Sequence, residues 1–90
     1  MRMQDQPHSA IARRLRRASG HLETIIDMIE QGRPCAQIAQ QLQAVESAIE
    51  SAKKALIHDH INHSLERTFK ASGSKGRAAL RDFKLIAKYL

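Results

Sequence analysis

The single cysteine of this chain and a histidine further along it are the side chains best suited to bind an ion together. Cys35 and His60 fall within one predicted helix, which runs from Pro34 to about Phe69. At a rise of about 1.5 Å per residue, this helix separates them by roughly 37 Å. The thiol and the imidazole therefore cannot meet within one chain, but they meet if two copies of the helix pack antiparallel. We predict a ligand site formed between subunits.

The residues before Cys35 suit it to ligand binding. Gly32 and Pro34 precede it, and glycine commonly ends a helix whereas proline suits the first turn of the next. Cys35 would then lie in a first helical turn, where the helix dipole and free backbone N–H groups favour a thiolate. The alternative interpretation is a half-buried cysteine that acts as a small hydrophobic side chain.

Histidines cluster near the end of the same helix, at positions 58, 60 and 63. His60 and His63 share a helix face because residues three apart are neighbours, whereas His58 points elsewhere. One thiolate with imidazoles suits Ni(II), Co(II) or Zn(II) better than Cu(I), which does best with two sulfurs. We predict Cys35, His60 and His63 as metal ligands, and His21 as a plain surface residue.

A basic cluster precedes this region, consisting of Arg13, Arg14, Arg16 and Arg17. On a helix, Arg13, Arg16 and Arg17 lie opposite the apolar positions and project into solvent. An ordinary solvated face would interleave acids, and none is present here. Binding to the phosphate backbone of DNA is therefore the better interpretation. The formal net charge of +6 over 90 residues also favours a polyanionic partner.

Apolar residues recur in steps of four and three along much of the chain, which predicts an all-α fold of three helices. The first helix follows a cap at Ser9, the second is the long central helix, and the third, capped by Ser74 within a Gly/Ser linker at 71–76, runs to Leu90. We expect a flexible tail at 1–8 and a single helical domain at 9–90. The periodic apolar positions are Ile11, Leu15, Ala18, Leu22, Ile25 and Ile29 in the first helix and Ile38, Leu42, Val45, Ile49, Ala52 and Leu56 in the second, and the expected core face of the third is Ala79, Phe83, Ile86 and Leu90.

The central helix is much longer than the mean of about 11–12 residues, so its companions would leave part of it uncovered. Small residues surround its midpoint at Ser47 and Ala48. An antiparallel pairing that brings Cys35 to His60 of a second copy places the helix crossing at this midpoint. We predict an antiparallel homodimer that assembles into a homotetramer.

Several classes of protein are excluded by what the chain contains. One cysteine cannot form an intrachain disulfide and fits a reducing compartment. No apolar run approaches the length of a membrane span, and the polar segment 1–9 lacks a signal-peptide core. We therefore expect a cytoplasmic protein with no membrane partner. No Gly-rich phosphate loop or nucleophile motif is present, so we expect no enzyme.

Four segments carry a recognisable pattern, namely RLRRASGH at 14–21, GRPC at 32–35, QQLQAV at 40–45 and DHINH at 59–63. Together they resemble the CsoR/RcnR family of small ligand-sensing repressors. The resemblance covers about Ile11 to Leu65 and, more weakly, the third helix. It implies helical dimers that pair into tetramers and bind operator DNA until an effector releases them. It also implies ligands at Cys35 and, from a second subunit, His60.

In this family the next ligand lies four residues further on, as cysteine in copper sensors and histidine in nickel and cobalt sensors. Here that position is Ser64, so the second thiolate of a copper sensor is missing. We expect a DNA-binding transcriptional repressor that a transition metal releases from its operator, with Ni(II) or Co(II) ahead of Zn(II) or Cu(I). The sequence leaves open whether Ser64, His8 or His58 joins the site.

Two alternatives to a metal sensor remain. The same scaffold could sense formaldehyde or another electrophile through Cys35. The chain could instead be a helical interaction protein without DNA binding, in which Cys35 is inert. Salt-dependent binding to DNA would exclude this last interpretation.

Overall fold

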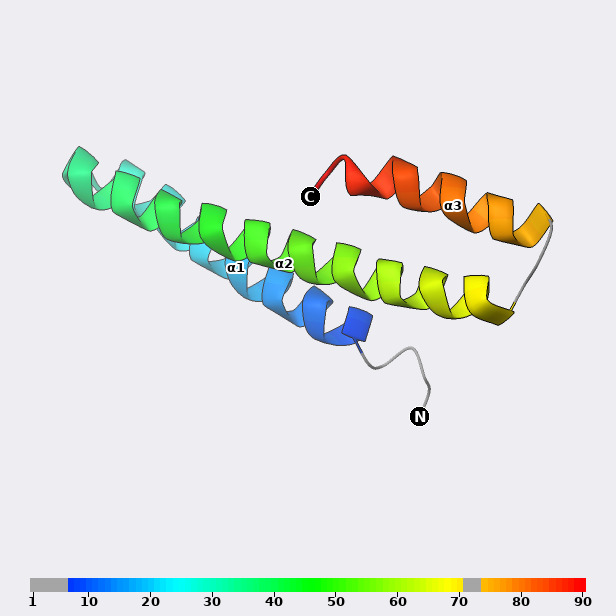
Figure 1. Ribbon diagram of the computed structural model, residues 1–90. Helices are drawn as coiled ribbons and strands as arrows, with labels where there is room; N and C mark the ends of the chain where they lie inside the picture. The colour runs from blue at the N-terminus through cyan, green and yellow to red at the C-terminus, as the bar shows by residue number, and fades with distance from the viewer. Residues whose placement is uncertain (1–6, 71–73) are drawn as a thin grey trace. The chain divides into compact units, whose positions relative to one another are not determined.

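The computed structural model describes residues 7–70 and 74–90, which form three helices (Figure 1). Helix α1 runs over Pro7–Glu30, α2 over Cys35–Lys70 and α3 over Ser74–Ala87. The all-α fold with a long central helix is therefore confirmed. The linker predicted at 71–76 is wrong for its second half, because residues 74–76 already belong to α3. Residues 71–73 lie outside the described part. None of the described helices is long and apolar enough to span a membrane.

Helix α1 begins at Pro7, before the predicted cap at Ser9, which therefore lies inside the first turn. Proline is favoured at a first helical position because the N–H that it lacks would have no helical partner there. The Oγ of Ser9 instead accepts a hydrogen bond of 3.3 Å from Nη1 of Arg13. The division into a tail at 1–8 and one domain at 9–90 stays a prediction.

The turn after α1 is built on Gly32, which has a φ of 72°. This left-handed conformation suits glycine because other residues are strained in it. The N–H of Gly32 donates to the carbonyl of Ile29, and the N–H of Arg33 donates to that of Met28, each at 3.0 Å. These paired bonds make a Schellman motif. The helix stop predicted at Gly32 is confirmed, and the chain turns back there.

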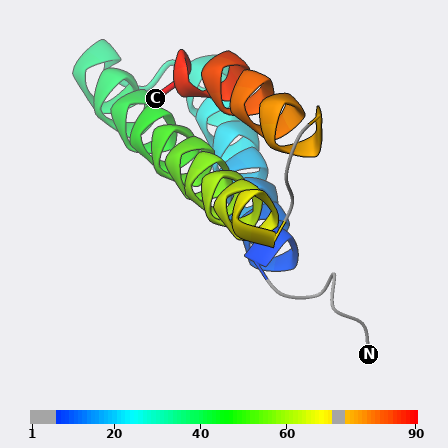
Figure 2. The ribbon, with the colours of Figure 1, turned by 45° about the vertical axis from the view of Figure 1, so that its right-hand side comes forward.

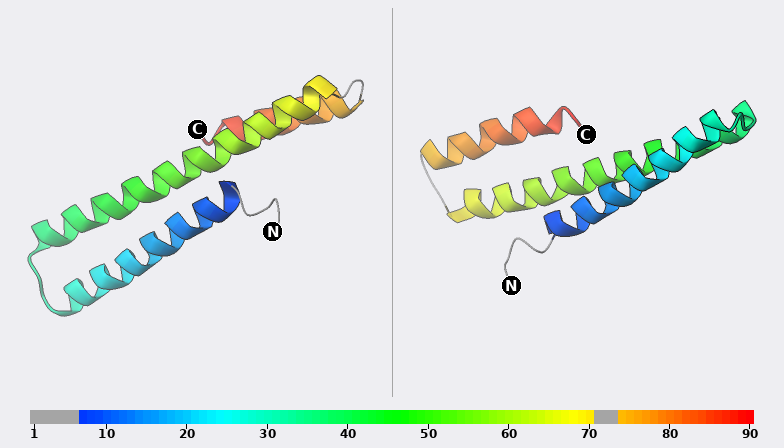
Figure 3. Two further views of the ribbon diagram at one scale, coloured as in Figure 1. Left: turned by 90° about the horizontal axis from the view of Figure 1, so that it is seen from below. Right: turned by 180° about the vertical axis from the view of Figure 1, so that it is seen from behind.

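The chain divides into two compact units, one of residues up to Lys53 and one of Lys54–Leu90. In the first unit, α1 and the N-terminal part of α2 form an antiparallel helical hairpin (Figures 2 and 3). Many of its core residues recur at intervals of seven, so one stripe on each helix is buried. The buried apolar residues of this unit are Ile11, Ala18, Ile25 and Met28 on α1 and Val45 and Ala52 on α2.

About half of the periodic apolar stripe on each of α1 and α2 is exposed rather than buried. An apolar stripe with steps of four and three spans a wide arc of the helix, and one neighbouring helix covers only part of that arc. About half of these apolar positions therefore stay uncovered within the single chain. The affected residues, each between 40% and 55% exposed, are Leu15, Leu22, Ile29, Leu42, Ile49 and Leu56.

In the second unit, α3 runs antiparallel along the C-terminal part of α2 (Figure 1). Ile57 on α2 is 2% exposed and is the largest fully buried side chain among the described residues of this unit. The core face predicted for α3 is only partly correct. Phe83 is 38% exposed and Leu90 is 62% exposed, because Leu90 lies beyond the end of the helix, whereas Ile86 is half-buried. The side chain of Ala79 lies outside the described part.

Candidate functional site

Cys35 is the first residue of α2, and its free thiol is exposed. The N–H groups of Gln37 and Ile38 donate to the carbonyl of Pro34 at 3.0 and 3.2 Å, so helical hydrogen bonding starts directly before the cysteine. The predicted position in the first helical turn is confirmed. The alternative of a half-buried cysteine is wrong for the single chain. The thiol is accessible to a metal ion or an electrophile.

His60 on α2 contacts a carboxylate on α3. Its Nε2 is hydrogen-bonded to Oδ2 of Asp82, and the two side chains are 34% and 43% exposed. Because a carboxylate only accepts hydrogen bonds, Nε2 carries the proton, and in the neutral ring Nδ1 keeps the free lone pair. Metal-binding histidines are commonly anchored through their second nitrogen in this way. The contact therefore holds the ring in place and leaves Nδ1 as the nitrogen available to a ligand.

Asp82 is a functional candidate that the sequence analysis missed. It is the one acidic residue in the sequence of α3, which otherwise carries only basic charges. A lone carboxylate on a basic helix is the signal that could have identified it. Its partner could not be found from the sequence, because the pairing depends on how α3 lies along α2.

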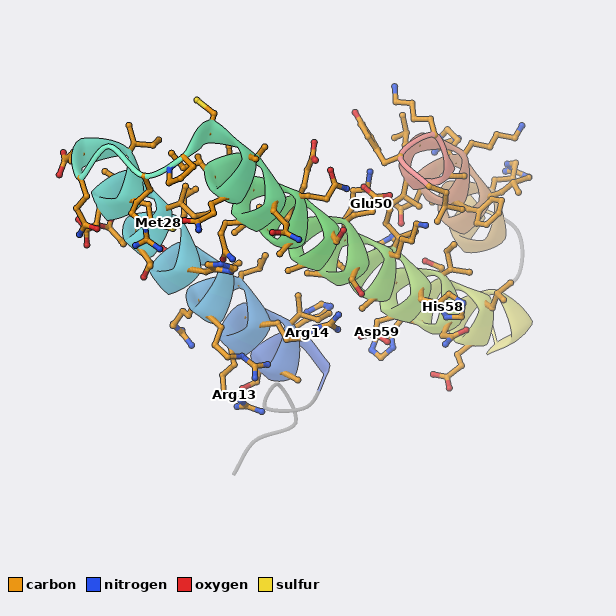
Figure 4. The ribbon with its side chains drawn as sticks, turned by 90° about the vertical axis from the view of Figure 1, so that its left-hand side faces the viewer. Arg13, Arg14, Met28, Glu50, His58 and Asp59 are labelled. Carbon is orange, nitrogen blue, oxygen red and sulfur yellow. The ribbon has the colours of Figure 1, made fainter. Side chains whose placement is uncertain are left out.

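The other polar residues near His60 differ in their exposure. His58 and His63 are exposed, whereas Ser64 is only 3% exposed. Figure 4 shows His58 and its neighbour Asp59 on the C-terminal part of α2. His63 lies one helical turn after His60 and can share a ligand with it. The buried hydroxyl of Ser64 is not presented to solvent beside these rings.

The predicted metal ligands are not brought together within one chain. Cys35 begins α2, and His60 follows 25 positions later in the same helix. Among the described residues, no three His, Cys, Asp or Glu side chains gather where they could hold a metal ion. The site shared between Cys35 of one chain and His60 of another stays a prediction.

The basic cluster divides into exposed and tethered arginines. Arg13, Arg16 and Arg17 are exposed, as the helical periodicity predicts. Arg14 is half-buried, and its Nη2 donates a hydrogen bond of 2.9 Å to Oγ of Ser51 on α2. In Figure 4, Arg14 extends toward α2 and Arg13 extends away from it. Three cations are thus presented to solvent together, while the DNA contacts themselves stay a prediction.

His21 joins α1 to α2, so its prediction as a plain surface residue is wrong. It is half-buried, and its Nε2 donates a hydrogen bond of 2.6 Å to Oε1 of Gln41. The sequence did contain a signal for this position. Ala18 and Ile25 lie three and four residues away on the same helix face, and both are buried. His21 therefore helps to fix the register of the hairpin.

The helical hairpin thus carries an exposed thiol and solvent-facing arginines, and the C-terminal part of α2 carries an imidazole anchored by a carboxylate. Sequence comparison identifies the family of the chain. The family described as metal-sensitive transcriptional repressor matches residues 7–88, and the chain belongs to it. This family consists of transcriptional repressors rather than enzymes, which agrees with the expectation from the sequence.

Individual relatives are copper-sensing transcriptional repressors. The chain is 40% identical over 68 residues to CsoR of Mycobacterium ulcerans, an alignment that covers 76% of this chain and 55% of the relative. It is 36% identical over 62 residues to RicR of Mycobacterium tuberculosis, covering 69% and 65%. It is 32% identical over 80 residues to CsoR of Bacillus subtilis, covering 87% and 79%.

The chain spans about half the length of the mycobacterial CsoR proteins that it matches. No solved structure matches it with significance.

Proposed function

We propose that this protein is a DNA-binding transcriptional repressor that a transition metal ion releases from its operator. The observation that carries the proposal is the match of nearly the whole chain to a family of metal-sensitive repressors. Arg13, Arg14, Arg16 and Arg17 are the proposed DNA contacts, and the exposed Arg13, Arg16 and Arg17 present their charge to solvent as a DNA backbone requires. Such a repressor acts in the cytoplasm, where operator DNA lies.

The effector site of this proposal is shared between two copies of the chain. Cys35 of one copy provides an exposed thiol, and His60 of the other provides an imidazole already anchored by Asp82. His63 is the proposed third ligand because it is exposed and lies on the same face of α2 as His60. A thiolate with imidazoles is a donor set that transition metals bind well.

A second copy of the chain is also the occupant we propose for the exposed apolar stripe. Leu42, Ile49 and Leu56 on α2 are at least 40% exposed although their spacing is that of a helix core. At about 100° per residue, they lie within roughly 50° of the face of α2 that carries Cys35 and His60. We propose an antiparallel pairing of α2 helices that forms the homodimer and doubles to a homotetramer.

The identity of the metal rests on two opposing arguments. A single thiolate favours Ni(II) or Co(II), followed by Zn(II), because Cu(I) prefers two sulfur ligands. The relatives named above sense copper and give no support to that preference. We propose Ni(II) or Co(II) as the effector because of the ligand types. Cu(I) is the alternative effector that the relatives favour.

A second candidate function is the sensing of an electrophile such as formaldehyde. It is favoured by the exposure of the Cys35 thiol, which can attack a small aldehyde without any rearrangement of the chain. In this case Cys35 would act without a metal, and His60 would not be required as a ligand.

The experiment is a DNA-release assay on fluorescent duplexes from the promoter of the gene itself, with Ni(II), Co(II), Zn(II), Cu(I) and formaldehyde added separately. Release by a metal, lost in Cys35→Ala and in His60→Ala, supports the proposal. Release by formaldehyde alone supports the electrophile sensor. If the protein binds no DNA at any salt concentration, both proposed sensor functions are contradicted. A helical interaction protein is then the remaining interpretation.

A further inference from the structure

Helix α3 carries a second set of cations, separate from the arginines of α1. Arg77, Arg81 and Lys84 follow one another at intervals of four and three residues, and Lys88 follows after four more. At about 100° per residue, the first three fall within an arc of roughly 60° on one helix face. Lys88 continues the series in the turn after α3, where the N–H of Tyr89 donates to the carbonyl of Ile86 at 3.1 Å. We call Arg77, Arg81, Lys84 and Lys88 the α3 stripe.

All four side chains of the α3 stripe are exposed. The one acid of the helix, Asp82, lies about 130° around it from the centre of the stripe and bonds to His60 on α2. Among the residues that the structure describes, no carboxylate pairs with any of the four cations. Lys88 keeps its ammonium 5.6 Å from the ring centre of Tyr89. The positive charge of this face is therefore directed to solvent.

This arrangement differs from an ordinary solvated helix face, which mixes acids with bases. Four like charges along one line repel one another and are stabilised when an anion binds beside them. The line from Arg77 to Lys88 is about 16 Å long at helical rise, so its length suits an extended polyanion better than a small anion. A regular row of phosphates provides such a ligand.

We propose that the α3 stripe is a second phosphate-binding surface, which contacts the DNA backbone in addition to the arginines of α1. The inference rests on the proposed repressor function and extends it by naming a further part of the DNA interface. Contacts of lysine and arginine with phosphates add affinity and fix the position of the protein without reading the base sequence. The α3 stripe therefore strengthens binding to any duplex.

The test compares salt dependence of DNA binding in matched variants of the full chain. The probe is a short random-sequence duplex labelled with a fluorophore, and binding is followed by anisotropy over a series of salt concentrations. The double variant Arg81→Gln/Lys84→Gln removes two charges from the α3 stripe. The control Arg33→Gln/Lys53→Gln also removes one arginine and one lysine, from exposed positions outside both basic regions. Circular dichroism confirms equal helicity, and Arg81→Lys retains the charge.

Each lost phosphate contact should lower the slope of log affinity against log salt by about 0.9, so the stripe variant should lose about 1.8. The control and Arg81→Lys should keep the wild-type slope. A stripe variant that matches the control, while wild-type protein still binds DNA, overturns this inference and leaves the proposed function intact. Wild-type protein that binds no DNA overturns both. Stripe-dependent binding to phosphatidylserine vesicles, with unchanged DNA binding, would assign the surface to a membrane instead.

Discussion

His60 on α2 and Asp82 on α3 share a hydrogen bond through Nε2 of the imidazole and Oδ2 of the carboxylate. The contact joins the predicted metal ligand of the long helix to the one acid of a basic helix. It fixes the tautomer of the ring and leaves Nδ1 as the nitrogen that can bind an effector. The effector proposal can be tested through this pair without changing any proposed ligand.

Replacing Asp82 with asparagine should weaken metal binding while leaving every proposed ligand in place. Loss of an anchoring carboxylate typically lowers metal affinity by about 10–100-fold, because the ring is less well oriented and less basic. Competition titration against a chromogenic chelator measures the affinity. Asp27→Asn, which changes an exposed acid on α1, is the matched control. Unchanged affinity in Asp82→Asn would show that His60 is not a ligand anchored in this way.

The same substitution should have opposite effects at two glycines. A Cβ added at Gly20 or Gly32 would have no described atom within 4 Å, apart from the neighbouring residues in the chain and the nearby backbone of the same helix. Neither substitution would therefore cause a steric clash. Gly20 is inside α1, so Gly20→Ala should raise the free energy of unfolding by about 0.5–1 kcal/mol. Gly32 has a φ of 72°, so Gly32→Ala should lower it by about 1–2 kcal/mol. Urea unfolding at one fixed protein concentration measures both changes in the free energy of unfolding. If the two changes had the same sign, the helix at Gly20 or the turn at Gly32 would be contradicted.

The sequence was informative about helices because their periodicity depends on neighbouring residues alone. The stop at Gly32 and the start at Cys35 follow from local backbone chemistry, and the structure has both. The sequence could not divide the apolar stripe into its buried and exposed halves. Ile25 is 1% exposed and Ile29 is 55% exposed, although both are isoleucines in the same periodic series. Only the position of α2 beside α1 distinguishes them.

The candidate site shows the same limit. Cys35, His60 and the arginines were proposed from residue type and spacing, without knowledge of the packing. Asp82 and the bond from Arg14 to Ser51 depend on contacts between helices that are distant in the sequence. Such contacts require the tertiary arrangement, and the sequence analysis accordingly missed both.

Replacing Ile49 with aspartate should dissociate the proposed dimer. Ile49 is 47% exposed in the single chain and lies within about 30° of the face of α2 that carries Cys35 and His60. A carboxylate there would be buried without a partner where the two α2 helices meet. Leu85→Asp makes the same kind of change at an exposed apolar position on α3 and should leave the assembly unchanged. Sedimentation velocity measures the mass, and a wild-type protein that is monomeric at micromolar concentration would refute the proposed assembly.

Removing two exposed arginines from α1 should weaken DNA binding and its dependence on salt. Arg16 and Arg17 are exposed, and Arg16→Ala/Arg17→Ala should lower the slope of log affinity against log salt by about 1.8. Anisotropy titrations over a salt series measure the slope, with Arg33→Gln/Lys53→Gln as the control. A loss of affinity with an unchanged slope would argue against phosphate contacts at these arginines.

The central claim is that Cys35 of one chain and His60 of another bind the same ion, and mixed dimers test it most directly. A dimer of one Cys35→Ala chain and one His60→Ala chain keeps one complete site, since both substitutions fall in the other. The measurement is metal bound per purified heterodimer, compared with the wild-type dimer. The heterodimer should bind about half of the wild-type amount, because a two-fold symmetric dimer has two equivalent sites. A heterodimer that binds no metal, or as much as the wild type, would contradict a site shared between subunits.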